Sequence, residues 1–118
     1  MKIRKLDRNN LTFEYNLFAQ RTFPWENVVA APFEGAWCFV PPGQQSLPHQ
    51  HEEKEVFIIV KGQGTAVSDD ETCAVEAGDV IYFEPGTTHS VINTSDEELV
   101  FFSIWWWDQH QHDSKLEL

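Results

Sequence analysis

The sequence predicts an all-β fold, an antiparallel sandwich or barrel, and three observations lead to this prediction. Short runs rich in Val, Ile, Phe, Tyr, Trp and Thr recur along the chain. Turn-forming residues separate these runs at regular spacing. Helix-type periodicity is sparse, and a chain of 118 residues with 42% hydrophobic and 14% aromatic content suits a globular fold rather than disorder.

The expected strands follow one another along the chain with turn chemistry between them. In order they are LTFEYNLFAQRTF (11–23), NVVAAPFEGAWCFV (27–40), EVFIIV (55–60), TAVS (65–68), TCAVE (72–76), VIYF (80–83), HSVIN (89–93) and LVFFSIWWW (99–107). The turns between the later strands are KGQG, DDE, AGD, EPGTT and TSDEE. We expect Gly62 and Gly64 to supply positive φ in the first of these turns, and Gly86 to do so before His89.

Length and composition favour one domain over residues 1–118, with a barrel core at about 34–107. The remaining segment DQHQHDSKLEL (108–118) is polar and lacks periodicity, so a flexible tail is predicted there. His110 and His112 in this tail lack a framing glutamate or glycine, and only adventitious metal binding is expected of them.

The charge distribution argues against nucleic acid as a partner. The formal net charge is −11, and four of the eight basic residues lie within the first eight positions, so the rest offers no basic patch for phosphates. No apolar run is long enough to span a membrane, and the start MKIRKLDRNN lacks a secretory apolar stretch. We therefore expect a cytoplasmic protein with no membrane partner, in which Cys38 and Cys73 stay reduced and Cys38 is a small buried hydrophobe.

The stretch HQHEEKE (49–55) contains the residues with the clearest chemistry. If His49 and His51 lie in extended chain, alternate side chains share a face about 6 to 7 Å apart, close enough to hold one ion. Glu55 heads the apolar run whose inward residues would be Phe57 and Ile59. A carboxylate on a core-facing position is costly without a partner, and a divalent cation would be such a partner.

His89 is the candidate for a fourth ligand, because it opens the strand HSVIN after a turn. Three imidazoles and one carboxylate suit Fe, Mn, Ni, Cu or Zn better than Ca or Mg, and the residue types do not choose among those five. An ion held on one side by protein keeps open positions, at which it can bind O₂, activate water or chelate a substrate.

Two motifs identify a family resemblance. The pattern G, five residues, HxH, three residues, E, six residues, G fits Gly43, His49, His51, Glu55 and Gly62. These positions, together with a second motif in register with them, resemble the cupins, which are small jelly-roll proteins. The sequence is thus predicted to form a cupin-type jelly-roll barrel.

The second motif is G, five residues, PxG, two residues, H, three residues, N. The matching positions are Gly78, Gly86, His89 and Asn93, with Glu84 standing where the family's first proline usually lies. The spacing and the histidine are kept despite that departure. Carried over position by position, the resemblance implies that His49, His51, Glu55 and His89 bind one divalent transition-metal ion per chain.

The cavity beside this site is expected to be apolar. The inward faces are predicted to carry Phe57, Phe83, Val91, Trp37, Phe39 and Phe102, with Gln45 and Tyr82 as candidate polar groups. Glu84 is interpreted as a solvated loop carboxylate near the turn that presents His89.

The run FFSIWWW bears on partners. Because Trp105, Trp106 and Trp107 are consecutive, at least one must emerge on the outer face, where large apolar side chains usually find a partner. Cupins often dimerise through outer sheet faces, so a homodimer is expected, with docking to another protein or domain as the alternative.

Three functions remain open, and no catalytic residue is assigned. The first is a small metal-dependent enzyme acting on a small molecule, a dioxygenase with Fe or an isomerase, cyclase or lyase with another ion. The second is a binding or regulatory module that holds a small molecule without turnover. The third follows from a resemblance of FFSIWWWD to zinc cupins that act beside a methionyl-tRNA-synthetase-like domain in forming nitrogen–nitrogen bonds of hydrazines.

Overall fold

Nine strands make up the regular structure of the computed structural model, which describes residues 1–28 and 31–107. They are β1 (Thr12–Glu14), β2 (Leu17–Arg21), β3 (Glu34–Val40), β4 (Lys54–Lys61), β5 (Gln63–Ser68), β6 (Glu71–Glu76), β7 (Val80–Phe83), β8 (His89–Ile92) and β9 (Leu99–Trp106). The predicted tail 108–118, with its two histidines, lies outside the described residues. No helix long and apolar enough to cross a membrane occurs in the described part of the chain.

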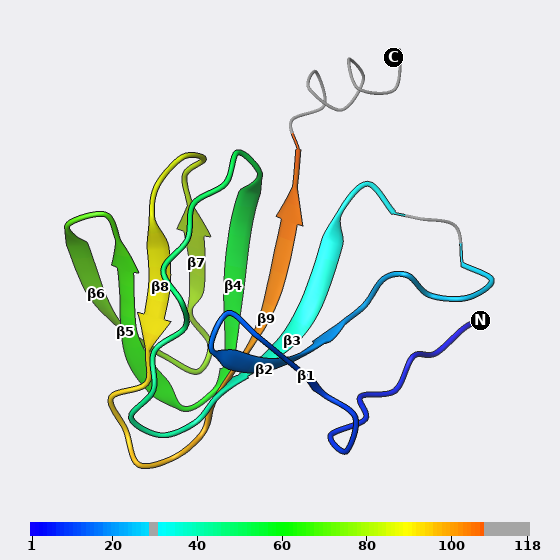
Figure 1. Cartoon of the computed structure of the whole chain (residues 1–118), viewed down its shortest axis with the longest axis horizontal. Coiled ribbons are helices and arrows are strands. Elements are labelled where there is room, and N and C mark those ends of the chain that lie inside the picture. Colours follow the sequence, from blue (N-terminus) through cyan, green and yellow to red (C-terminus); the bar gives the residue numbers. More distant parts are fainter. Residues whose placement is uncertain (29–30, 108–118) are drawn as a thin grey trace.

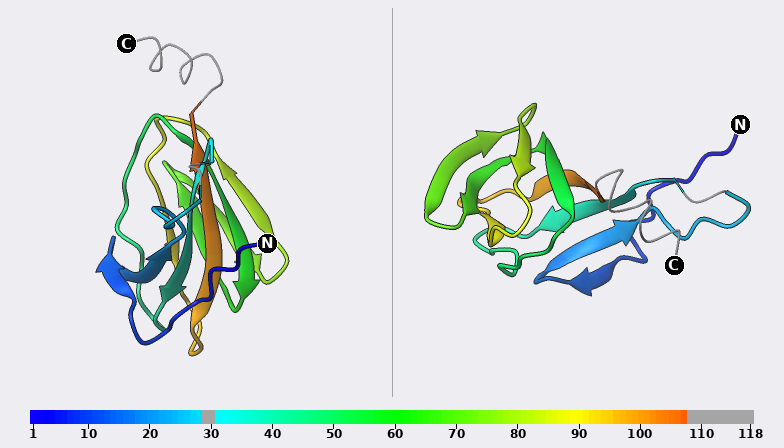
Figure 2. Two further views of the ribbon diagram at one scale, coloured as in Figure 1. Left: turned by 90° about the vertical axis from the view of Figure 1, so that its right-hand side faces the viewer. Right: turned by 90° about the horizontal axis from the view of Figure 1, so that it is seen from above.

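The strands form two antiparallel sheets that face each other (Figure 1). The larger sheet has the order β1-β2-β3-β9-β4-β7 and the smaller one the order β6-β5-β8. From β4 onward the chain passes repeatedly between the two sheets, as in a jelly roll. Figure 2 shows β5 and β6 at one side of the molecule and the hairpin β1–β2 at the other. The predicted all-β jelly-roll barrel is confirmed.

The core lies between the inner faces of the two sheets. Phe57 on β4 stacks on Phe101 of β9, with ring centroids 4.2 Å apart, and meets Phe83 of β7 edge-on at 4.9 Å. Val91 of β8 closes the core from the smaller sheet, and Cys38 is buried as predicted. Alternation along each strand produces this arrangement, because every second side chain points inward.

Two of the expected strands are organised differently from the prediction. Segment 11–23 is a hairpin rather than one strand, because Tyr15 and Asn16 adopt positive φ values of 52° and 59° and form a two-residue turn. Segment 27–40 enters its strand only at Glu34, after Asn27 with φ 64°. Neither turn contains glycine, so the usual signal for positive φ was missing.

Three aromatic residues predicted to point inward face the other side of the large sheet. Trp37 pairs with Phe102 across β3 and β9, and their rings meet edge-on outside the core. Phe39 is 1% exposed, but it is covered by the Arg8 guanidinium 3.9 Å from its ring rather than by the barrel core. The prediction was wrong because the small residues of β3, Ala36 and Cys38, take the inner face.

The tryptophans at the end of β9 alternate in the same way. Trp105 packs against the core, and its neighbour Trp106 therefore lies on the opposite face of the strand. This agrees with the expectation that at least one tryptophan of the run leaves the inner face, while the homodimer stays a prediction.

The glycines divide into two physical types. Gly62 and Gly86 have φ values of 90° and 79°, as predicted for turns. The prediction for Gly64 was wrong, since it lies within β5 and does not have positive φ. A Cβ there would stand 2.4 Å from the carbonyl oxygen of Ile92, so close strand approach explains this glycine.

Candidate metal centre

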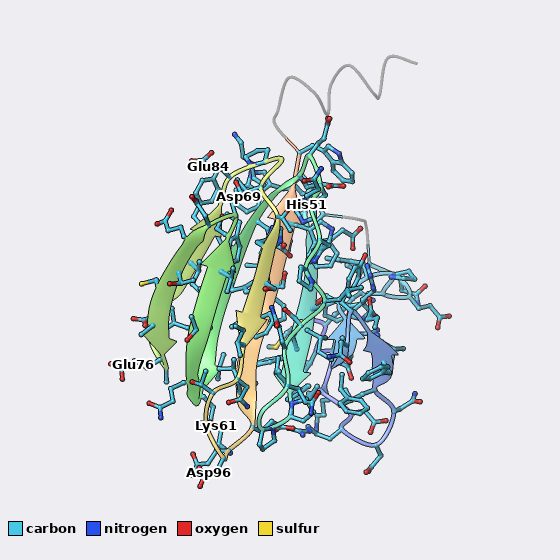
Figure 3. All side chains as sticks on the ribbon, turned by 60° about the vertical axis from the view of Figure 1, so that its left-hand side comes forward. His51, Lys61, Asp69, Glu76, Glu84 and Asp96 are labelled. Atoms are coloured by element: carbon cyan, nitrogen blue, oxygen red, sulfur yellow. The ribbon has the colours of Figure 1, made fainter. Side chains whose placement is uncertain are left out.

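The four predicted ligands gather at one end of the barrel. His49 and His51 lie in the irregular segment before β4, Glu55 lies in β4, and His89 begins β8. The two histidines of the HxH motif lie outside the nine strands. An isolated bridge between His49 and His89, with backbone bonds in both directions, holds the segment in place. Figure 3 shows His51 at the same end as Asp69 and Glu84, opposite Lys61 and Asp96.

The donor atoms of the four side chains all lie within 4.8 Å of one another. Glu55 Oε1 is 3.1 Å from Nε2 of His51 and 2.7 Å from Nε2 of His89. The ring centroids of His49 and His89 are 4.5 Å apart. One atom from each residue could therefore reach a single ion.

Backbone carbonyls orient all three imidazoles. Nδ1 of His49 lies 3.1 Å from the carbonyl oxygen of Leu47, and Nδ1 of His51 lies 2.9 Å from that of Glu53. Nδ1 of His89 is 3.3 Å from the carbonyl oxygen two residues before it. A carbonyl oxygen only accepts, so Nδ1 carries the proton and donates, which leaves the Nε2 lone pair directed into the cluster.

This arrangement fits a cation. The Nε2 lone pairs of His51 and His89 meet the carboxylate oxygen Oε1 of Glu55 at hydrogen-bonding distance, although none of these atoms then carries a proton. Two lone pairs at that separation repel unless a proton or a metal ion lies between them. Neutral imidazoles and a carboxylate are the ligand set that borderline transition metals prefer.

Burial and hydrogen bonds set the protonation of the site. Burial alone would raise the pKa of Glu55, which is 5% exposed, but the adjacent imidazoles of His89 and His51 and the hydrogen bond from Ser103 outweigh burial and lower that pKa. Burial lowers the pKa of His49 and favours its neutral form. An ionised Glu55 and a neutral His49 are the forms that bind a metal ion.

A cavity of about 210 Å³ opens beside the cluster. Its lining is more polar than predicted, and it is formed by Glu14, Tyr15, Leu17, Ala19, Arg21, Ala36, Cys38, Ser46, His49, His51, Glu53, Glu55, Phe57, Phe101, Ser103 and Trp105. The two predicted polar groups lie elsewhere, since the Gln45 amide donates to Ser90 Oγ and Tyr82 is 45% exposed outside the cavity. Glu84 is exposed, as predicted.

Sequence reasoning missed the contribution of the first hairpin to this cavity. Glu14 and Arg21 face it because the turn at Tyr15 folds β1 back on β2. Asn16 Nδ2 donates to the carbonyl oxygen of Gln45, which fixes the hairpin tip to the segment carrying the HxH motif. The ring of Tyr15 lies 4.7 Å from that of His49.

Ser103 supports the carboxylate, and its replacement should weaken metal binding. Its Oγ donates to Glu55 Oε2 at 2.5 Å, and the residue is 3% exposed. We expect Ser103→Ala to lower metal affinity roughly tenfold to a hundredfold, as for other groups that orient a ligand. A competition titration with a chromophoric chelator would measure this loss.

Ser90→Ala is the matched control, because Ser90 is 1% exposed on β8 but bonds to Gln45 rather than to Glu55. Equal affinities of the Ser103→Ala and wild-type proteins would contradict an orienting role.

Fold and site together define a class, the small antiparallel barrels with a candidate mononuclear metal centre at one end. Within this class the Cupin domain family model matches residues 36–105, more than half of the chain. The chain belongs to the cupin family.

Two solved structures are similar over nearly the whole chain. A Cupin 2 conserved barrel domain protein from Salinispora arenicola CNS-205 is 46% identical, with 97% of this chain and 94% of that chain covered and a TM-score of 0.87. The plu4264 protein from Photorhabdus luminescens is 38% identical, with 98% of both chains covered and a TM-score of 0.85.

A curated relative matches a shorter stretch. The oxalate-binding protein of Thermotoga maritima is 33% identical over 66 residues, which cover 55% of this chain and 54% of that protein. The chain thus spans about half the length of this relative.

Proposed function

We propose that the protein acts on a small molecule at one divalent transition-metal ion held by His49, His51, Glu55 and His89. The observation that carries this proposal is the convergence of four donor atoms within 4.8 Å of one another. The ion could be Fe, Mn, Ni, Cu or Zn, since all accept this ligand set. When bound, it would supply open positions at which an oxygen of a ligand is held and polarised.

The chain's own residues account for binding and orientation. Carbonyl oxygens at residues 47, 53 and 87 hold the three imidazoles with Nε2 toward the cluster, and Ser103 holds Glu55. Phe57 and Phe101 stack on each other and give the cavity an apolar part of its lining. The polar residues that the first hairpin contributes to the cavity can bind a molecule with charged or hydrogen-bonding groups.

An enzyme is the first form of this proposal, a dioxygenase with iron or an isomerase, cyclase or lyase with another ion. A module that binds a small molecule without turnover is the second, and the match to an oxalate-binding protein supports it. The hydrazine-forming alternative stays a prediction that rests on the sequence FFSIWWWD. A cytoplasmic location and a homodimer belong to the proposal as well.

Elemental analysis of untagged protein tests the proposal. We expect near one equivalent of a transition metal per chain in the wild-type protein, and its loss in the His49→Ala, His89→Ala double variant. The element found selects the next assay: O₂ uptake for iron, and a screen of isomerisation and elimination substrates for the other ions. A folded wild-type protein that takes up none of the five metals would contradict the proposal.

A further inference from the structure

The hairpin β1–β2 forms one wall of the cavity, and it lies outside residues 36–105, which the family model matches. Five cavity-lining residues come from it, and two of them, Glu14 and Arg21, carry charge. Residues of this wall can therefore contact a ligand bound at the metal centre and add ligand specificity that the family motifs do not supply.

Arg21 is held in a fixed position on this wall. Its Nε lies 3.1 Å and its Nη2 lies 2.5 Å from Oε1 of Glu14, and Thr12 Oγ1 donates to the other oxygen of that carboxylate. The guanidinium carbon is 5.4 Å from the centre of the Trp105 ring. A guanidinium held from two sides loses little freedom when it binds a further group.

The same contacts leave half of the guanidinium available. Glu14 uses the edge formed by Nε and Nη2, whereas no described residue accepts a hydrogen bond from Nη1. The open edge, formed by Nη1 and the second hydrogen of Nη2, has the spacing that matches a carboxylate. The Arg21 side chain is 46% exposed and lines the cavity, so a ligand in the cavity can reach this edge.

The register of the sheet gives the backbone separation between Arg21 and the strand that supports the metal centre. Arg21 pairs with Ala36, and Ala36 pairs with Ser103, whose hydroxyl holds Glu55. Two neighbouring-strand steps amount to about 10 Å at the backbone. Ala19, Ala36 and Cys38 line the space between, and their short side chains leave it open. A cavity of about 210 Å³ corresponds to roughly seven water molecules, the size of a small organic acid.

The charges of the cavity limit where an anionic group can bind. Apart from the histidines, Arg21 is the one basic side chain on this cavity among the described residues. The acidic side chains that line the cavity are Glu14, Glu53 and Glu55, and Glu34 also lies near Arg21. Glu14 is engaged by Arg21 and Thr12, Glu55 by the cluster, and the Glu53 carboxylate lies 3.3 Å from Nδ1 of His51. The two places that attract an anion are the open edge of Arg21 and, when it is bound, the metal ion.

We propose that Arg21 binds the carboxylate of a small organic acid whose other end presents oxygen atoms to the metal centre. This inference rests on the proposed function and adds the substrate class: an acid anchored at both ends, with its anionic group several bonds from the metal-binding oxygens. Glu14 and Trp105 are positioning residues for Arg21.

Calorimetric titration with two acids of equal length tests this assignment. The probes are 2-oxoglutarate, which has a remote carboxylate, and 2-oxovalerate, which ends in a methyl group but carries the same chelating end. The protein is loaded with Zn²⁺, which has no redox chemistry. We expect the wild-type protein to bind 2-oxoglutarate roughly tenfold to a hundredfold more tightly, and Arg21→Gln to abolish that preference while leaving 2-oxovalerate affinity unchanged.

Arg8→Gln is the matched control, because Arg8 also forms a two-bond pair, with Glu98, but lies over Phe39 away from the cavity. It should keep the preference for 2-oxoglutarate. Equal affinities for the two acids in the zinc-loaded wild-type protein, or no binding of either, would overturn the inference about Arg21 alone. A wild-type protein that takes up no Zn²⁺ would overturn the proposed function and this inference with it. A preference for 2-oxoglutarate that persists in Arg21→Gln would likewise overturn it, and equal wild-type affinities would overturn it even if that variant does not fold.

Discussion

His51→Ala should lose most of the bound metal and keep the barrel. The substitution removes one of four converging donor atoms, and we expect metal affinity to fall at least about a hundredfold. This loss should exceed the one expected for Ser103→Ala, which removes only a group that orients a ligand. The fold should survive because His51 lies in an irregular segment and is half-buried, while the core around Phe57 and Phe83 does not include it. Elemental analysis gives metal per chain, and far-ultraviolet circular dichroism reports the retained strands.

His112→Ala is the control for this experiment, since it removes a histidine from the second HxH sequence, outside the described residues. It should leave the stoichiometry near the wild-type value. A fully loaded His51→Ala protein would remove His51 from the ligand set, and an equal loss in His112→Ala would show that the tail binds the metal.

The strands were predictable because most carry their own local signals. From β4 onward, apolar alternation and glycine or aspartate turns mark each strand, and the structure follows these signals closely. The first hairpin was not predictable in this way, since its turn is Tyr15-Asn16, where asparagine alone hints at positive φ. Its pairing with β3 depends on contacts far apart in the sequence.

Which face of a strand points inward was harder to predict than the strand itself. In β3 both parities contain apolar residues, so hydrophobicity alone favoured Trp37 and Phe39. The structure instead turns Ala36 and Cys38 inward, where their short side chains line the cavity. Phe39 gains its burial from Arg8, which is 31 positions earlier in the chain and gives no local signal.

The cluster of four candidate ligands was predictable from spacing, but its orientation was not. Two motifs placed His49, His51, Glu55 and His89 in the sequence, and the structure brings them together. The carbonyl groups that fix the imidazoles belong to the backbone, and Ser103 lies 48 positions after the carboxylate it holds. The carbonyl groups give no side-chain signal and Ser103 has no motif spacing, so only the folded chain identifies these supporting groups.

Gly64→Ala should destabilise the barrel more than an alanine substitution at a glycine whose added Cβ would enter open space, such as Gly43. The added Cβ would lie 2.4 Å from the carbonyl oxygen of Ile92 and would push β8 away from β5, although no change of φ is required. We expect a loss of about 2 to 3 kcal/mol in the free energy of unfolding, measured by urea titration. Gly43→Ala is the contrast, because Gly43 has φ 74° but nothing within 4 Å, so only the backbone cost of about 1 to 2 kcal/mol applies. Because β8 begins with His89, Gly64→Ala should also weaken metal binding, whereas Gly43→Ala should not. Equal losses of stability in the two variants, without any change in metal affinity, would refute the coupling between this strand contact and the candidate metal centre.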